Sequence, residues 1–326
     1  MTLTKLAQLA NVSVSTVSKA LSDSREISHA TKAMIIEIAK KHGCYEKYCK
    51  PKYAKKVICV ICPELLGIHY TQMATSIEGE IAALGGTMIL GVSNFSEKTQ
   101  NELIEYYTKF VHADGIIVIE PQGRIKNDTE IPIVEIGLES EANDTDCVRV
   151  DIFPAMAEAL SCLLKNGHER IGFIGEELAK AEYGYFCQAM KNRMIKYREE
   201  DVVISDKRFY DAGYYAMDKM LKQKSLPSVI FAAYSHIASG ILQRLKEENL
   251  SVPRDISLIC MDDITSAPYS DIRLSCIKMH LDDLCAIATD LLFKKIEKGY
   301  IKTKQTITVT REFTKSDSIR NCRDKL

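Results

Sequence analysis

From Val57 onward, the chain alternates between short apolar segments and longer segments with helical periodicity. Strands that are apolar at nearly every position are buried on both faces, and a helix between two such strands lets them lie parallel. We expect strands at residues 57–62, 87–92, 115–120, 131–137, 170–175, 228–233, 255–260 and 306–310, with helices such as 71–84, 154–165, 237–248 and 282–297 between them. So many strands predict two Rossmann-like α/β lobes, with a ligand cleft beyond the carboxyl ends of the strands.

The first 43 residues have a different pattern, which predicts three short helices. Thr2, Ser13 and Ser28 each precede a helical segment, where a hydroxyl can accept a hydrogen bond from a free backbone N–H. Asn11 suits a left-handed turn after the first helix, and Gly43 suits the end of the third. A helix, a tight turn and a second helix on a supporting helix is a helix-turn-helix DNA-binding head. The alternative is an ordinary three-helix bundle with a polar face.

The second helix, expected at residues 14–21, carries the candidate base-reading side chains. Its exposed face presents Val14, Ser15, Thr16, Ser18 and Lys19. Small methyl and hydroxyl groups can approach base edges, and a lysine can reach guanine or phosphate.

Charge is unevenly distributed along the chain. Residues 1–56 contain 11 Lys and Arg against 4 Asp and Glu, a net charge of +7, whereas the whole chain has a net charge of −1. A basic head on an acidic body is typical of a nucleic-acid-binding module joined to an unrelated domain. No apolar segment reaches the about 18 residues that span a membrane, and the start does not have the pattern of a signal peptide. We therefore expect a cytoplasmic protein without a membrane partner.

The 11 cysteines are scattered without the spacing of a disulfide framework, which indicates reduced thiols. Cys59 and Cys62 form a C-x-x-C pattern inside an expected strand, where packing and redox or metal chemistry are the two interpretations. We find no G-x-G-x-x-G or P-loop, and the seven histidines have no metal-ligand spacing. We therefore expect no cofactor, no metal site and no enzymatic activity.

Several stretches resemble the lactose-repressor/galactose-repressor (LacI/GalR) family of transcription regulators. VSVSTVSKAL, within residues 2–43, resembles the core of the family's DNA-binding head. NGHERIGFIG, ENLSVPRDISLICMDD and ITVTREFTKSDS resemble successive segments of its ligand-binding body. The resemblance covers nearly the whole chain.

This resemblance implies a head followed by a two-lobed body like the periplasmic sugar-binding proteins. We expect a head at 1–46, a basic hinge at 47–56 and a body at 57–326. Lobe one would then comprise 57–150 and 278–305, and lobe two 151–277 and 306–326, with crossings near Val150–Asp151, Ile277–Lys278 and Gln305–Thr306. Family members bind pseudo-palindromic operators as homodimers, and sugars or purines shift their operator affinity. On the resemblance, Val14, Ser15 and Lys19 read bases, with Ser13 and Thr16 nearby.

The hinge departs from the family pattern. The family's hinge carries a leucine that enters the minor groove, whereas this linker has no leucine and contains Pro51, which disfavours a helix. Tyr48 and Tyr53 are the possible substitute wedges. The residues suited to phosphate contact are Lys47, Lys50, Lys52, Lys55 and Lys56.

The cleft departs from the pattern as well. The candidate effector-binding residues, by alignment with the family, are Tyr70, Glu182, Tyr234, Ser235 and Asp262. Glu182 stands where the family has a sugar-binding arginine, and Tyr234-Ser235 stand where it has an Asn-Asp pair. Asp262 is kept, with either a structural or a ligand-binding role. The change from donors to acceptors disfavours neutral hexoses and leaves three alternatives: a modified sugar, an amine-bearing ligand or no effector.

The sequence therefore predicts a DNA-binding transcription regulator, expected to be a repressor, with a cleft for a small effector. An effector-independent regulator is the first alternative, and a solute-binding protein is the second. The tail after Thr314 has no leucine heptads for a coiled coil, so we expect a dimer and not a tetramer.

Overall fold

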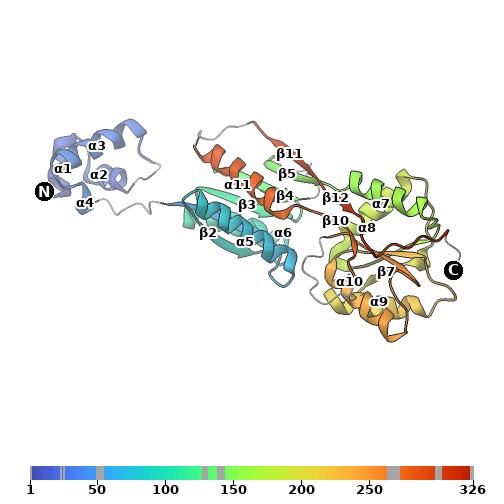
Figure 1. Cartoon of the computed structure of the whole chain (residues 1–326). Helices are drawn as coiled ribbons and strands as arrows, with labels where there is room; N and C mark the ends of the chain where they lie inside the picture. Colours follow the sequence, from blue (N-terminus) through green and yellow to red (C-terminus); the bar gives the residue numbers. More distant parts are fainter. Residues whose placement is uncertain are drawn as a thin grey trace. The chain divides into compact units, whose positions relative to one another are not determined.

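The computed structural model describes residues 2–22, 24, 26–48, 55–126, 131–137, 144–262, 272–297 and 303–323. The chain separates into two compact units, Met1–Lys56 and Val57–Leu326, which we call the head and the body (Figure 1).

The head is helical. Its helices are α1 (Leu3–Ala10), α2 (Val14–Leu21), α3 (His29–Lys41) and a single turn, α4 (Tyr45–Tyr48). The first three confirm the expected helices, whereas α4 was not expected and spans the expected boundary between head and hinge at residues 46–47. Leu6, Val17 and Ile35, one from each long helix, are fully buried against one another and form the centre of a small core.

Local chemistry explains where the head helices begin and end. The hydroxyls of Thr2, Ser13 and Ser28 accept hydrogen bonds from backbone N–H groups three residues later, at 3.3, 3.0 and 3.2 Å. Asn11 adopts a left-handed conformation (φ 51°) and ends α1, and Gly43 (φ +64°) follows α3. The expected caps and turn are thus present, and the left-handed residues let the chain reverse within a few residues.

Lobe one of the body is built on a six-stranded sheet in the order β11-β5-β4-β3-β1-β2. The pairs β1–β3, β3–β4, β4–β5 and β5–β11 are parallel. Its elements are β1 (Lys56–Cys62), α5 (Ile68–Ala83), β2 (Gly86–Val92), α6 (Glu97–Tyr106), the π-helical η1 (Tyr107–Val111), β3 (Gly115–Ile119), β4 (Ile133–Gly137), β5 (Asp146–Asp151), α11 (Leu281–Glu297) and β11 (Thr306–Thr310).

Lobe two has a second six-stranded sheet, in the order β12-β10-β9-β8-β6-β7. It is parallel except for the antiparallel pair β10–β12. Its elements are α7 (Phe153–Lys165), β6 (Ile171–Glu176), η2 (Glu177–Ala179), α8 (Lys180–Asn192), η3 (Glu199–Asp201), β7 (Val202–Ser205), α9 (Phe209–Leu221), β8 (Val229–Ala232), α10 (Ser235–Glu247), β9 (Ser257–Cys260), β10 (Ser275–Lys278) and β12 (Glu312–Thr314). The two lobes confirm the predicted fold class.

Strand pairing corrects two of the expected crossings between lobes. Thr306–Thr310, expected in lobe two, pairs in register with β5 from Thr306↔Cys147 to Thr310↔Asp151. This edge strand therefore belongs to lobe one, and the chain crosses after it, at Arg311. Lys278 still pairs with Glu312 in lobe two, so the preceding crossing follows Lys278. The cause is hydrogen bonding: an edge strand joins the sheet whose free N–H and C=O groups it meets.

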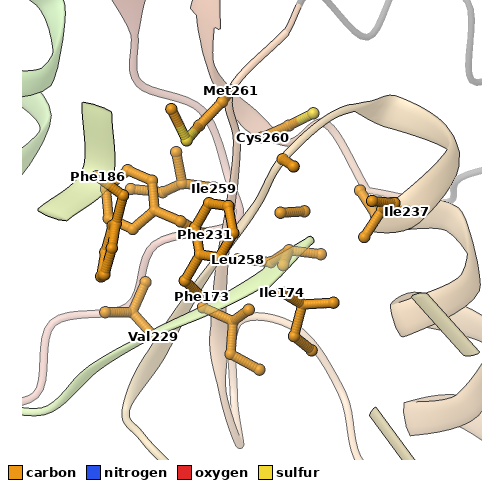
Figure 2. Close-up of a cluster of buried hydrophobic side chains, with 14 of the residues drawn as sticks. Phe173, Ile174, Phe186, Val229, Phe231, Ile237, Leu258, Ile259, Cys260 and Met261 are labelled. Atoms are coloured by element: carbon orange, nitrogen blue, oxygen red, sulfur yellow. The ribbon is translucent and has the colours of Figure 1, made fainter. Parts of the chain in front are cut away.

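Apolar burial on both faces of each sheet provides the cores. In lobe two, Phe173, Phe186 and Phe231 are fully buried, and the Phe186 and Phe231 rings lie 5.6 Å apart (Figure 2). Ile174, Ile237 and Ile259 complete the same cluster (Figure 2). Losing one of these phenyl rings would cost about 3–5 kcal/mol, because both the transfer free energy and the packing around the ring would be lost.

The C-x-x-C pattern lies inside β1. Cys59 packs with Ile61 on one face of the sheet, and Cys62 packs with Ile58 and Val60 on the other. Burial raises the pKa of the Cys59 thiol to about 12 and that of Cys62 to about 11. Side chains three positions apart on a strand point to opposite faces, so these thiols are core residues and share neither a metal nor a disulfide.

Candidate nucleic-acid interface and ligand cleft

The start of α2 presents small polar side chains to solvent. Ser13 caps the helix and its hydroxyl also lies 2.8 Å from the Thr16 hydroxyl. Ser13, Val14 and Ser15 are exposed and Thr16 is partly exposed. Val17 and Leu21, on the opposite side of the helix, are buried. The amphipathic pattern therefore orients the expected base-reading residues outward.

Lys19 lies one turn further along α2 and is partly exposed. Its ammonium forms an ion pair with Glu26, in the segment before α3, a partner that the sequence analysis did not identify. Both side chains are well exposed, at 43% and 68%, so the pair is worth roughly 0–1 kcal/mol. Lys19 can therefore leave Glu26 for a base or a phosphate at little cost.

The expected phosphate-contacting lysines fall into two groups. Lys47 lies in the single turn of α4, with its ammonium 5.3 Å from the centre of the Tyr48 ring, and Lys55 and Lys56 are exposed. Tyr48 packs against the head core, which argues against its insertion into the DNA minor groove as a substitute for the leucine. Lys50 and Lys52, like Pro51 and Tyr53, lie outside the described residues.

All five residues nominated for effector binding line a single cavity of about 120 Å³ in the body. Lobe one contributes Tyr70, and lobe two contributes Glu182, Tyr234, Ser235 and Asp262. These residues lie at the carboxyl ends of strands or in the first turn of the following helix, as expected for parallel sheets.

Two glycines set the close packing of the helices that bring Tyr234 and Phe209 to this cavity. A Cβ on Gly213 of α9 would lie 2.0 Å from the Ile237 carbonyl oxygen, and one on Gly240 of α10 would lie 2.1 Å from the Tyr210 carbonyl oxygen. Only glycine permits so close an approach of two helix backbones. The N-termini of α9 and α10 therefore lie side by side at the cavity.

Glu120, at the end of β3, is the acceptor of a small cluster in lobe one. The Tyr70 hydroxyl donates to its Oε2 at 2.5 Å, and His69 Nε2 lies 3.6 Å from its Oε1. The hydrogen bond and charge of Glu120 raise the pKa of His69 against the effect of burial. The same contacts lower the pKa of Glu120 itself, although burial acts in the opposite direction. We therefore describe Glu120 and His69 as a charged pair.

Glu182, in the first turn of α8, is in a different state. Burial, reinforced by the charge of Glu120, raises its pKa from 4.5 to about 7. Among the residues that the structure describes, its carboxyl group forms no ion pair. Near neutral pH this side chain is therefore divided between a hydrogen-bond donor and an anion.

Arg208, the residue before α9, bridges the two lobes. Its guanidinium donates to both carboxylate oxygens of Glu64 in lobe one, at 2.6 and 2.8 Å, and more weakly to Glu176 in lobe two, at 3.3 and 3.4 Å. It also lies 4.3 Å from the centre of the Phe209 ring. Glu176 further accepts the Phe209 N–H at 3.0 Å. We call Arg208, Glu64 and Glu176 the inter-lobe latch.

Arg311, at the crossing between β11 and β12, is a second guanidinium on the cavity wall. Its Nη1 donates to the Met261 carbonyl oxygen at 2.7 Å, and its side chain is buried. Its Nε is buried without a hydrogen-bond partner in the described part of the chain. Its charge acts on Glu120, Glu182 and His69.

The sequence analysis missed the latch, Glu120 and Arg311. A signal was present for four of them: Glu64, Glu120, Glu176 and Arg311 each end or closely follow an expected strand, where parallel sheets place ligand-binding groups. Arg208 follows no expected strand, and its partner Glu64 is far away in the sequence. Within the described residues, no group of three His, Cys, Asp or Glu side chains is arranged to hold a metal ion. In that same part of the chain, no helix is long and apolar enough to cross a membrane.

Comparison with protein families identifies both units. Residues 2–45 match the model described as "Bacterial regulatory proteins, lacI family". Residues 160–318 match the "Periplasmic binding protein-like domain".

Individual relatives match over nearly the full length. Catabolite control protein A of Priestia megaterium is 26% identical over 313 residues, covering 91% of this chain and 93% of the relative. The HTH-type transcriptional repressor PurR of Escherichia coli O139:H28 is 29% identical over 311 residues, covering 90% of each chain.

Solved structures share the fold. The lac repressor dimer bound to operator and the anti-inducer ONPF has a TM-score of 0.72 at 16% identity, covering 98% of this chain and 99% of that chain. The CelR–cellobiose complex has a TM-score of 0.69 at 20% identity, with the same coverage. The chain therefore combines a lacI-family head, at residues 2–45, with a periplasmic-binding-protein-like domain in its body.

Proposed function

We propose that this protein is a transcription regulator that binds a pseudo-palindromic DNA operator as a homodimer, through α2 of each head. The observation that carries the proposal is the outward face of α2, where Ser13, Val14, Ser15 and Thr16 surround a capped helix N-terminus with Lys19 one turn away. Helix N-termini bind phosphate, and short side chains there reach base edges. The net charge of +7 in residues 1–56 supplies the attraction for DNA.

We infer repression as the direction of control and the cytoplasm as the place of action. The E. coli relative is named a transcriptional repressor, and its match covers 90% of this chain. Lys47, Lys50, Lys52, Lys55 and Lys56 contact phosphates in this proposal, because their segment connects the head to the body and is basic. The role is binding and not catalysis, in keeping with the names of the relatives.

We further propose that a small effector occupies the cavity lined by Tyr70, Glu182, Tyr234, Ser235 and Asp262 and shifts operator affinity. The effector would contact both lobes, so it would favour whichever lobe arrangement holds it better. An effector-independent regulator is the second candidate. The inter-lobe latch favours it, because Arg208 and Glu64 join the two lobes through the protein's own side chains.

Selection of bound sequences from a random DNA pool, using the full-length protein, tests the proposal. We expect two inverted half-sites with centres about one helical turn apart, ~34–36 Å. A matched duplex with one half-site scrambled is the control and should bind much more weakly. Bound sequences without inverted symmetry would contradict dimeric operator recognition.

A further inference from the structure

The cavity carries more negative than positive charge. Seven of its lining residues are carboxylates or guanidiniums: Glu64, Glu120, Glu176, Glu182, Asp262, Arg208 and Arg311. Even with a protonated His69, the carboxylates outnumber the cations among the lining residues that the structure describes. A neutral ligand would leave this imbalance in place, whereas a cation would reduce it.

The imbalance is concentrated at Glu182. Glu64 and Glu176 share Arg208, and Glu120 has His69 and Tyr70. Glu182 forms no ion pair in the described part of the chain. Burial and the charge of Glu120 raise the pKa of Glu182, and the charges of Arg311 and His69 offset this rise only in part.

Arg311 is a positively charged residue on the same cavity wall. Arg311 lines the same cavity, is only 8% exposed, and leaves its Nε–H without a partner among the described residues. A guanidinium on a cavity wall attracts a ligand oxygen, because a hydrogen bond to a charged donor is stronger than one to a neutral donor. The cavity thus favours a cation beside Glu182 and a hydrogen-bond acceptor beside Arg311.

Aromatic rings complete the wall. Tyr70 and Phe95 lie edge to face with ring centres 6.1 Å apart, and Phe209 and Tyr234 do so at 6.3 Å. Ring faces attract organic cations. The Arg208 guanidinium over the Phe209 ring, between Glu64 and Glu176, is an internal example of this chemistry in the same cleft.

We propose that the effector is a small organic cation, an ammonium or guanidinium compound that also carries a hydroxyl or carboxylate oxygen. Its charged group lies against Glu182 between aromatic rings, and its oxygen accepts from Arg311. This inference rests on the proposed function, because it names the ligand class of the same cleft.

Isothermal titration calorimetry of the full-length protein tests the proposal. The cationic probes are D-glucosamine and L-arginine, which carry oxygen acceptors, and putrescine, which does not. The neutral probes are N-acetyl-D-glucosamine and D-glucose. We expect D-glucosamine or L-arginine to bind at least tenfold more tightly than either neutral sugar, and more tightly than putrescine.

Variants identify the site. Glu182→Gln keeps the shape but removes the charge, and it should lower the affinity for the cationic probe at least tenfold. Glu177→Gln, an exposed glutamate outside the cavity, is the matched control and should leave that affinity unchanged. The proposal is wrong if no cationic probe binds, if a neutral sugar binds as tightly, or if both variants behave alike.

Operator binding by the same preparations separates the two proposals. If wild-type protein binds its selected operator but shows no preference for cationic probes, only the proposed ligand class is contradicted. If wild-type protein binds no operator, the proposed function is contradicted, whatever the calorimetry shows.

Discussion

The inter-lobe latch offers a test of how the two lobes are held together. Arg208→Gln removes the guanidinium and leaves Glu64 and Glu176 facing one another, with exposed side-chain fractions of only 9% and 3%. Two buried carboxylates without their cation repel each other and are poorly solvated. We therefore expect a less stable body and a weaker association of the lobes.

The magnitude follows from burial and geometry. Removing one partner of a buried ion pair costs about 3–5 kcal/mol. The Arg208 side chain is 33% exposed, so solvent screens part of its interaction, and we expect about 2–3 kcal/mol. A domain of this size loses about 2–4 °C of Tm per kcal/mol, which gives a decrease of roughly 5–10 °C.

Thermal and urea denaturation of the full-length protein, followed by circular dichroism, measure this effect. Arg198→Gln is the matched control, because Arg198 pairs with Glu200 while both are more than half exposed. That change should cost less than about 1 kcal/mol. The double variant Glu64→Gln/Arg208→Gln should be more stable than Arg208→Gln alone, since it removes a stranded charge.

Two results would refute the reasoning. Equal Tm values for Arg208→Gln and Arg198→Gln would mean that the latch does not stabilise the body. A double variant less stable than Arg208→Gln would mean that the loss comes from packing against Phe209 and not from stranded charge.

The remaining predictions concern DNA, pH and assembly. Lys19→Ala should relax base preference at one position per half-site, at a cost of about 1–3 kcal/mol in binding free energy. Lys55→Ala should weaken binding to all sequences equally and reduce the slope of log affinity against log salt concentration by about 1. Anisotropy titrations on operator variants at several salt concentrations measure both effects, and an equal loss on every operator for Lys19→Ala would contradict its role in base reading. Folding raises the pKa of Glu182 from 4.5 to about 7. The contribution of this group to the free energy of unfolding is therefore fully present below pH 4.5 and is lost as the pH rises through 7. Glu182→Gln should therefore match the wild type at low pH and exceed it by up to about 3 kcal/mol above pH 7, as measured by urea denaturation across that range; a constant difference would refute this. Light scattering should give a dimer, because the proposed recognition of two inverted half-sites requires two heads, and a stable tetramer would contradict it.

Local chemistry made the head predictable. The hydroxyls of Thr2, Ser13 and Ser28 lie within three residues of the N–H groups they cap, and Asn11 needs only its own backbone conformation. Periodicity likewise predicted the central strands of both sheets, because a strand covered on both faces is apolar throughout.

One central strand with several charged residues escaped prediction. β5, with the sequence DCVRVD, was missed although it lies inside the lobe-one sheet. Its Asp146 is tolerated there because Lys295 of α11 lies 2.9 Å away, a partner about 150 residues later in the chain. The short strands β7, β10 and β12 were missed for a related reason, since a strand of three or four residues is defined by its neighbour more than by its own sequence.

Sequence patterns were sufficient to predict the class of protein, the cap and turn positions of the head, and the five residues that line the cavity. The lobe to which Thr306–Thr310 belongs depends on tertiary structure, because an edge strand pairs with the backbone groups that it meets. Only the tertiary structure joined Glu64 to Arg208, which are 144 residues apart, and set Glu182 within the field of Glu120. Electrostatic interactions depend on distance in space and on burial, and neither quantity can be read along a chain.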